Sequence, residues 1–209
     1  MLIWTWVTLL VFLCTIWVAV ARELSNALLG YLVQTGLVAV LYGMDAVRSH
    51  DTSMWVAFGG LIVVRGVIVP SLVWIRLPRS VMHQRSNLFL GTPTFGVSTA
   101  VLISLVTGFI VSAWHAQGAL SFGFALATLF TGIAVTSLTH DAGRQMVGLL
   151  CAENGVDTAI AAELSRVSVM ADYVMFIDIA LVVVLFVALI GHYGRAGSFN
   201  LRDFHQLRG

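Results

Sequence analysis

The stretch of sequence that decides the fold runs from Arg144 to Ile160 and reads RQMVGLLCAENGVDTAI. Its apolar residues predict a membrane-spanning helix, although Glu153 and Asp157 stand near its middle. Because four positions separate these two acids, they lie on one helix face, about 6 Å apart along the axis. An ionised acid at the centre of a spanning helix costs about 2.5 to 3.5 kcal/mol on translocon scales. The helix must therefore bury both carboxylates against partners, water or another helix.

The composition of the whole chain is that of an integral membrane protein. Of its 209 residues, 59% are hydrophobic and 10% are charged, whereas soluble domains contain about 25% charged residues. The net charge of +1 gives no footprint for nucleic-acid binding. Cys14 and Cys151 fall within apolar spans, and no two of the six histidines form an i, i+4 pair. We therefore expect no metal or other cofactor in this chain.

Hydropathy predicts an all-α fold with seven transmembrane helices, since a span needs about 20 apolar residues. The predicted spans are 2–21, 27–44, 54–76, 96–114, 122–139, 145–163 and 171–191. The first lacks the basic residues that precede a signal peptide, so we expect it to be retained. Segment 21–30 is similar to segment 141–148, which predicts that spans one to three and five to seven are parallel repeats.

Arginines in the loops predict the orientation of the bundle. Eight lie on one side of the predicted membrane, namely Arg22, Arg76, Arg79, Arg85, Arg144, Arg195, Arg202 and Arg208. Only Arg48 and Arg166 lie on the other side. The positive-inside rule places the C-terminal tail in the cytoplasm and Met1 outside.

Five polar residues within the spans are candidates for a proton or ion relay: Glu153, Asp178, Arg65, Asp157 and Gln34. Intramembrane ionisable groups are rare and usually functional. Structural alternatives exist for each. Glu153 and Asp178 could only hold helices together, Arg65 could be a structural counter-ion, Asp157 could be hydrated near the membrane surface, and Gln34 could be an interhelical hydrogen-bond partner.

Three motifs carry a resemblance to a known family: GLLCAENG at 148–155, RGVIVP at 65–70 and LRG at 207–209. Over essentially the whole chain they resemble component E of hydrogenase-4, a membrane subunit of group 4, formate-hydrogenlyase-type complexes. From about Phe122 onward the chain is also similar to subunit K of respiratory complex I, which has an acid in each of its last two spans. By this resemblance Glu153 falls just after the first of those acids, and Asp178 corresponds to the second.

The resemblance implies three parts: an N-terminal four-helix membrane part (1–114), a three-helix part similar to subunit K (115–191) and a cytoplasmic tail (192–209). It also implies a subunit without an active site of its own, in the inner membrane of a bacterial or archaeal cell. Antiporter-like subunits would be neighbours, and nickel–iron and iron–sulfur centres would belong to partner subunits. The expected function is proton or Na⁺ translocation within a complex I-like oxidoreductase. A structural adaptor and an independent secondary transporter are the alternatives.

Overall fold

A computed structural model describes residues 2–50, 52–76, 82, 98–99, 101–103, 106–107, 110, 119–139 and 142–163. Every element within these ranges is a helix, and no strand occurs among them. Most of the predicted span 96–114 lies outside the described residues. So do all of span 171–191, its Asp178 and the tail 192–209.

Five of the predicted spans are helices in the structure. The first two are α1, Leu2–Val20, and α2, Leu24–Ser49. The third is a continuous run of α3 Thr52–Gly60, η1 Leu61–Ile68 and α4 Val69–Arg76. The last two are α7, Ala119–Leu138, and α8, Ala142–Glu163. Four helical stretches, Ile3–Val20, Leu24–Ser49, Thr52–Ile75 and Leu120–Leu138, are long and apolar enough to cross a membrane. Although α8 is as long, its polar residues lower its hydropathy. The described part is therefore an α-helical bundle with the character of a membrane protein.

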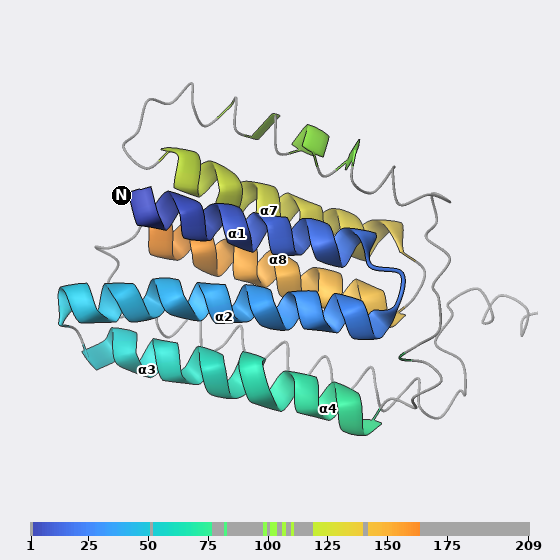
Figure 1. Cartoon of the computed structure of the whole chain (residues 1–209), viewed down its shortest axis with the longest axis horizontal. Coiled ribbons are helices and arrows are strands. Elements are labelled where there is room, and N and C mark those ends of the chain that lie inside the picture. Colours follow the sequence, from blue (N-terminus) through green and yellow to red (C-terminus); the bar gives the residue numbers. More distant parts are fainter. Residues whose placement is uncertain are drawn as a thin grey trace, which may run out of the picture.

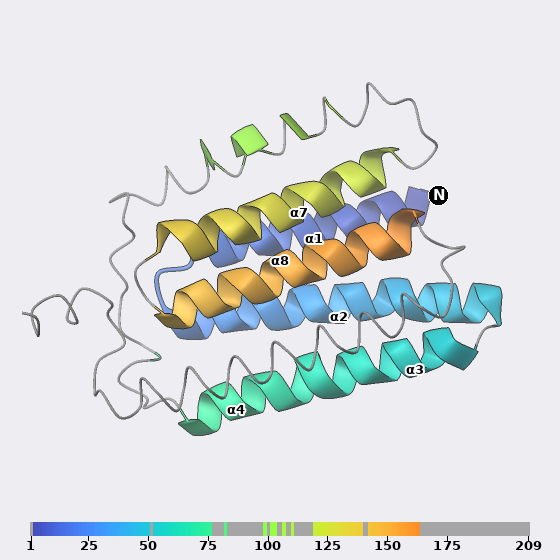
Figure 2. The same ribbon diagram turned by 180° about the vertical axis from the view of Figure 1, so that it is seen from behind.

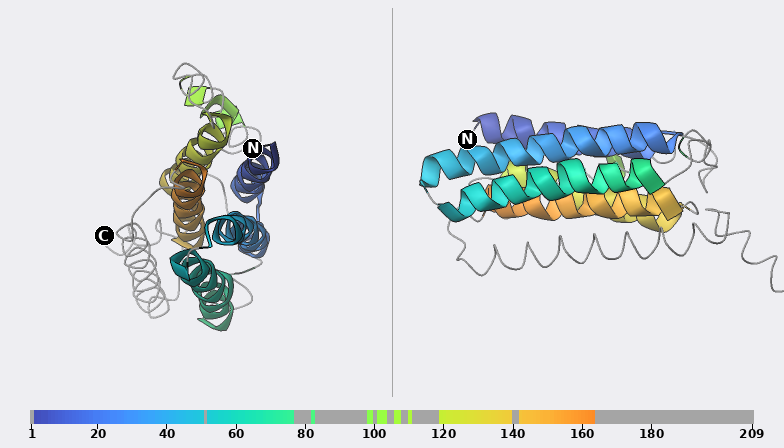
Figure 3. Two further views of the ribbon diagram at one scale, coloured as in Figure 1. Left: turned by 90° about the vertical axis from the view of Figure 1, so that its left-hand side faces the viewer. Right: turned by 90° about the horizontal axis from the view of Figure 1, so that it is seen from below.

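Two helical hairpins form the body of the bundle. Helices α1 and α7 run in one direction, and α2 and α8 run in the opposite direction (Figures 1 and 2). Each hairpin packs on the other, because α1 contacts α7 and α2 contacts α8. The α3–η1–α4 run covers an outer face of α2 (Figure 3). Helices α7 and α8 thus pack directly on the N-terminal helices.

The two hairpins share one register in the sequence. Helices α1 and α7 end at Val20 and Leu138, and α2 and α8 begin at Leu24 and Ala142, so both pairs are separated by the same 118 positions. The glycines agree with this register. A Cβ on Gly30 would meet Val18 and Cys14, and one on Gly148 would meet Thr136 and Gly132. This spacing agrees with the predicted repeat for the first two helices of each half; the third helix of the later half lies outside the described residues.

Helices α7 and α8 approach each other at glycines. A Cβ on Gly155 would lie 2.5 Å from the backbone nitrogen of Leu129, and one on Gly148 would lie 2.8 Å from that of Thr136. Such close approach is typical of small residues at helix interfaces in membranes, where backbone packing replaces the hydrophobic effect. The position of α8, and of the acids on it, is fixed by this interface.

Arg144 joins the start of α8 to the end of α1. The residue is 1% exposed, and its guanidinium donates hydrogen bonds to the carbonyl oxygens of Val18 at 3.1 Å and Ala19 at 3.5 Å. The last carbonyls of a helix have no intrahelical partner and carry partial negative charge, so a buried cation is favourable there. The contact sets the depth of α8 relative to α1.

Two apolar clusters form the core of the bundle, at different positions along the helices. One apolar cluster includes Val18, Tyr31, Val69 and Cys151, and a second includes Val11, Val38, Leu61 and Ala161. Between these positions on α1, α2, η1 and α8 stand buried polar residues. We call them the polar layer: Thr15, Gln34, Thr35, Arg65, Glu153, Asn154, Asp157 and Thr158.

Candidate functional site

Arg65 enters the polar layer from a π-helix. Residues Leu61–Ile68 form η1, and the N–H of Val69 donates to the carbonyl of Val64, five positions back. Pro70, which follows, has no N–H for the carbonyl of Gly66, and its ring crowds that carbonyl. A wider turn before Pro70 relieves the crowding, and π segments of this kind are frequent at functional sites. Arg65 lies within the widened turn and is 1% exposed.

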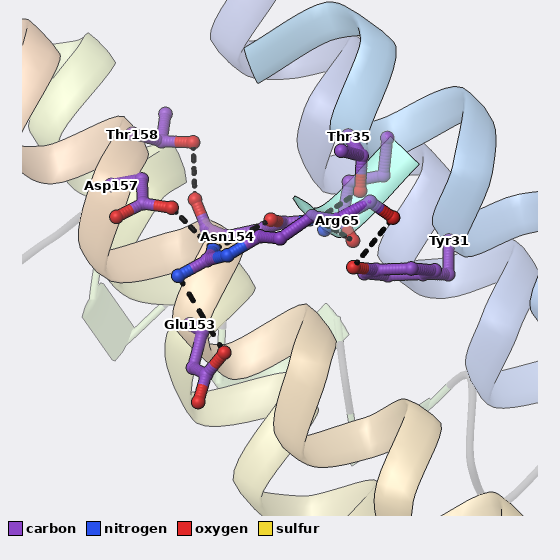
Figure 4. A network of polar contacts seen from close by, with 8 residues as sticks. Tyr31, Thr35, Arg65, Glu153, Asn154, Asp157 and Thr158 are labelled. Atoms are coloured by element: carbon purple, nitrogen blue, oxygen red, sulfur yellow. Dashed lines mark hydrogen bonds and ion pairs between the residues drawn. The ribbon is translucent and has the colours of Figure 1, made fainter. Parts of the chain in front are cut away.

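The guanidinium of Arg65 faces two carboxylates of α8 (Figure 4). Its Nη1 forms an ion pair with Oδ2 of Asp157, and its Nη2 lies 3.6 Å from Oε2 of Glu153. All three side chains are buried; the exposed fraction of the Asp157 side chain is 3%, and that of Glu153 is 10%. The prediction that Glu153 and Asp157 share one helix face is confirmed, because both face the same cation.

A chain of hydrogen bonds leads from Arg65 across the bundle. Nη1 donates to Oδ1 of Asn154 at 3.1 Å, and Nδ2 of Asn154 donates to Oε1 of Gln34 at 3.1 Å. Nε2 of Gln34 then donates to Oγ1 of Thr15 at 2.7 Å, which donates to the carbonyl of Val11 at 3.1 Å. Each group donates away from Arg65, so the aligned dipoles stabilise its positive charge. The chain connects η1, α8, α2 and α1.

Three further contacts fix the ends of this arrangement. The hydroxyl of Tyr31 donates to the carbonyl oxygen of Arg65 at 3.3 Å, within the π-helix where backbone bonding is irregular. Nδ2 of Asn154 also donates to Oγ1 of Thr35 at 3.0 Å, and Oγ1 of Thr158 donates to the carbonyl of Asn154 at 2.6 Å. Arg65 and Asn154 are therefore held in place from several helices.

Among the residues that the structure describes, the charges of this cluster do not balance. Arg65 remains protonated under all ordinary conditions, and it faces two carboxyl groups, Glu153 and Asp157. With both acids ionised, the three groups carry a net charge of −1. An uncompensated charge in a buried site is costly. One proton, or one other monovalent cation, makes the cluster neutral.

The structure brings together four of the five predicted relay residues: Arg65, Glu153, Asp157 and Gln34. The fifth, Asp178, lies outside the described residues. Asp157 is 2% exposed and pairs with Arg65, which corrects the alternative that it is hydrated near the membrane surface. Among the described residues, no group of three or more His, Cys, Asp or Glu gathers as a metal site.

Sequence reasoning missed Asn154 as a site residue. It was treated only as part of the GLLCAENG motif, yet it is fully buried and joins Arg65 to Gln34 and Thr35. The amide of Asn154 stands near the middle of an apolar span, and this position could have marked it as a site residue. A buried amide without a hydrogen-bond partner is unfavourable there, as a buried acid is. Thr15 and Tyr31 gave weaker signals, since both residue types are common in apolar helices.

The described residues thus define a class of protein: a helical membrane protein with a charged cluster buried between its helices. Comparisons of the chain with protein families, with curated proteins and with solved structures found no match.

Proposed function

We propose that the chain is a non-catalytic membrane-arm subunit of an energy-converting, complex I-like hydrogenase or oxidoreductase complex. In this proposal it contributes to the translocation of protons, or of Na⁺, through buried carboxylates. The observation that carries the translocation role is that, among the described residues of the polar layer, one cation, Arg65, faces two acids. A buried site that is one positive charge short of neutrality takes up and releases one cation more readily than a balanced pair does.

Glu153 is the exchanging acid in this proposal, and Asp157 is the fixed counter-ion. Nη1 of Arg65 contacts Asp157 directly and is also held by Asn154. Glu153 lies farther from the guanidinium and is the more exposed of the two acids. A proton needs only one carboxylate oxygen, whereas Na⁺ needs several oxygen ligands and would lie close to the charge of Arg65. The geometry therefore favours a proton.

Assignment to a hydrogenase-type complex rests on the resemblance to component E of hydrogenase-4. Its support in the structure is that two of the motifs meet: RGVIVP supplies Arg65, and GLLCAENG supplies Glu153 and Asn154. Nickel–iron and iron–sulfur centres would lie in partner subunits, with antiporter-like subunits beside this chain. The inner membrane, an outer N-terminus and a cytoplasmic C-terminus belong to the same proposal.

A structural adaptor is the second candidate, and one observation favours it. The hydrogen-bond chain from Arg65 ties η1, α8, α2 and α1 together, so the same cluster could serve only to hold these helices. Interhelical hydrogen bonds in membranes contribute about 0.6 kcal/mol on average. An amide that keeps the hydrogen bonding of Glu153 but cannot carry a proton separates the two roles.

The experiment uses the complex purified through a tag on this chain in mild detergent, together with membrane vesicles that contain it. Redox subunits that purify with the tagged chain would support the complex; a fully active lone chain or homo-oligomer would contradict it. Glu153→Gln should assemble normally and lose most ion-coupled activity. Glu23→Gln, an acid at the start of α2 and outside the cluster, is the control. Full ion translocation by an assembled Glu153→Gln complex would leave only the adaptor role.

A further inference from the structure

Two buried hydroxyls on α7 lie near the polar layer but take no part in its hydrogen bonds. Thr128 is fully buried, and Thr131 is 2% exposed. Among the described residues, no atom is a hydrogen-bond partner of Oγ1 of either threonine. Buried hydroxyls without a partner are unusual, because each loses its bonds to water on folding. The two hydroxyls are therefore candidates to bind a small buried ligand.

Other threonines in these helices show how such a hydroxyl is ordinarily satisfied. Oγ1 of Thr139 donates to the carbonyl of Val135 at 2.8 Å, and Oγ1 of Thr136 donates to that of Gly132 at 3.0 Å. Both bonds reach back four positions along α7, as is common for threonine in a helix. Thr128 and Thr131 belong to the same helix, yet their hydroxyls do not make this contact.

Two contacts between α1 and α7 place Thr15 at a depth between Thr128 and Thr131. Oγ1 of Thr5 lies 3.2 Å from Oγ of Ser121, ten positions before Thr15 and Thr131 respectively. The rings of Phe12 and Phe124 stack between these helices, with centroids 6.2 Å apart. The two helices run in the same direction (Figure 1). Thr15 stands three positions after Phe12, and Thr128 stands four after Phe124, so each lies one turn farther on the same helix face. Thr131 follows on that face of α7.

Thr15 can accept one more hydrogen bond. A hydroxyl has one donor and two acceptor sites. Oγ1 of Thr15 donates to the carbonyl of Val11 and accepts one bond from Gln34. A ligand that both donates and accepts could bond to Thr15 on one side and to the hydroxyls of α7 on the other. Neither α1 nor α7 contains an acidic or basic residue, so this ligand is neutral.

We propose that Thr15, Thr128 and Thr131 form a buried water-binding site between α1 and α7. Buried waters typically make about three hydrogen bonds to polar groups that would otherwise be unsatisfied. Water here extends the hydrogen-bond chain of Arg65, Asn154 and Gln34 through Thr15 to α7. Neutral hydroxyls do not offer the charge that would hold a metal cation. The inference holds whether or not Glu153 exchanges protons.

The test compares the complex that contains the wild-type chain with one that carries Thr128→Val and Thr131→Val together. Valine keeps the shape of threonine and removes the hydroxyl. Infrared spectra of hydrated films prepared in H₂¹⁶O and H₂¹⁸O should show an isotope-sensitive O–H band of bound water that the double variant lacks. Thr139→Val, whose hydroxyl bonds to its own helix, should retain the band. An unchanged band in the double variant would overturn the proposal.

The melting temperature provides a second measurement if the double variant does not fold. Each single variant should melt at a lower temperature than the wild type, because it loses hydrogen bonds to bound water. If the site holds no water, the melting temperature should rise instead. A methyl group in place of an unsatisfied buried hydroxyl removes the cost of burying that hydroxyl. Higher melting temperatures for both single variants would contradict the water site.

Discussion

Arg65 and Asp157 stand 92 positions apart in the sequence and form a direct ion pair inside the bundle. The pair connects the π-helix η1 to α8, and both side chains are almost fully buried. Because Glu153 faces the same guanidinium, Arg65 is the only positive charge among the three groups of the cluster. Its removal should therefore affect the protein more than the removal of either acid.

The first prediction concerns the order of these effects on stability. Arg65→Met leaves two buried carboxyl groups without their cation, and loss of one partner of a buried pair costs about 3–5 kcal/mol. Asp157→Asn should cost less, because Glu153 remains as a counter-charge. Thermal unfolding of the purified complex, or its yield from membranes, measures the order. A more stable Arg65→Met than Asp157→Asn variant would contradict this account of the cluster.

Asn154 should act as the junction of the hydrogen-bond chain. Asn154→Leu keeps a similar volume but leaves Gln34 and Thr35 without their donor and removes one acceptor from Arg65. Each buried polar group left without a partner costs about 1–3 kcal/mol. A double-mutant cycle of Asn154→Ala with Gln34→Ala should show a coupling energy clearly above zero. Additive effects of the two substitutions would show that the contact contributes little.

Glycine substitutions should test the close approach of α7 and α8. Gly155→Ala places a methyl group 2.5 Å from the backbone of Leu129, so the helices must separate. Over-packing of this kind costs about 1–3 kcal/mol. Gly36→Ala in α2 is the control, since no atom outside its own helix backbone and chain neighbours lies within 4 Å of the added Cβ. Equal melting temperatures for the two variants would mean that α7 and α8 accommodate the added methyl group without loss of stability.

The orientation in the membrane can be tested by cysteine labelling in a background that lacks Cys14 and Cys151. The arginine distribution predicts that Ser198→Cys is protected from a membrane-impermeant reagent in intact cells. Ser53→Cys, at the start of α3, should be labelled because that end of the bundle is predicted to face outward. Labelling of Ser198→Cys from outside would reverse the proposed orientation.

Hydropathy and spacing predicted the helices but not the contacts between them. The span at 145–163 was recognised despite its acids, and the four-residue spacing placed Glu153 and Asp157 on one face. Neither argument specifies which helix supplies the cation, because the approach of η1 to α8 depends on packing against α2. The π-helix before Pro70 was also beyond sequence reasoning, since a proline predicts a disrupted hydrogen bond but not how the helix responds. Asp178 and the seven-span count remain predictions.

The constant separation of the two hairpins has a consequence for how the molecule treats its two sides. At 118 positions before Glu153 and Asp157 stand Thr35 and Ala39, so the earlier copy of the hairpin has no acid at either place. The hairpins α1–α2 and α7–α8 therefore share one sequence spacing but differ in charge. The acids stand in the later hairpin, and their cation comes from the α3–η1–α4 run beside the earlier one. In the membrane-arm subunit proposed above, neighbouring subunits on the two flanks would meet chemically different surroundings, and this difference would give the assembly a defined lateral order.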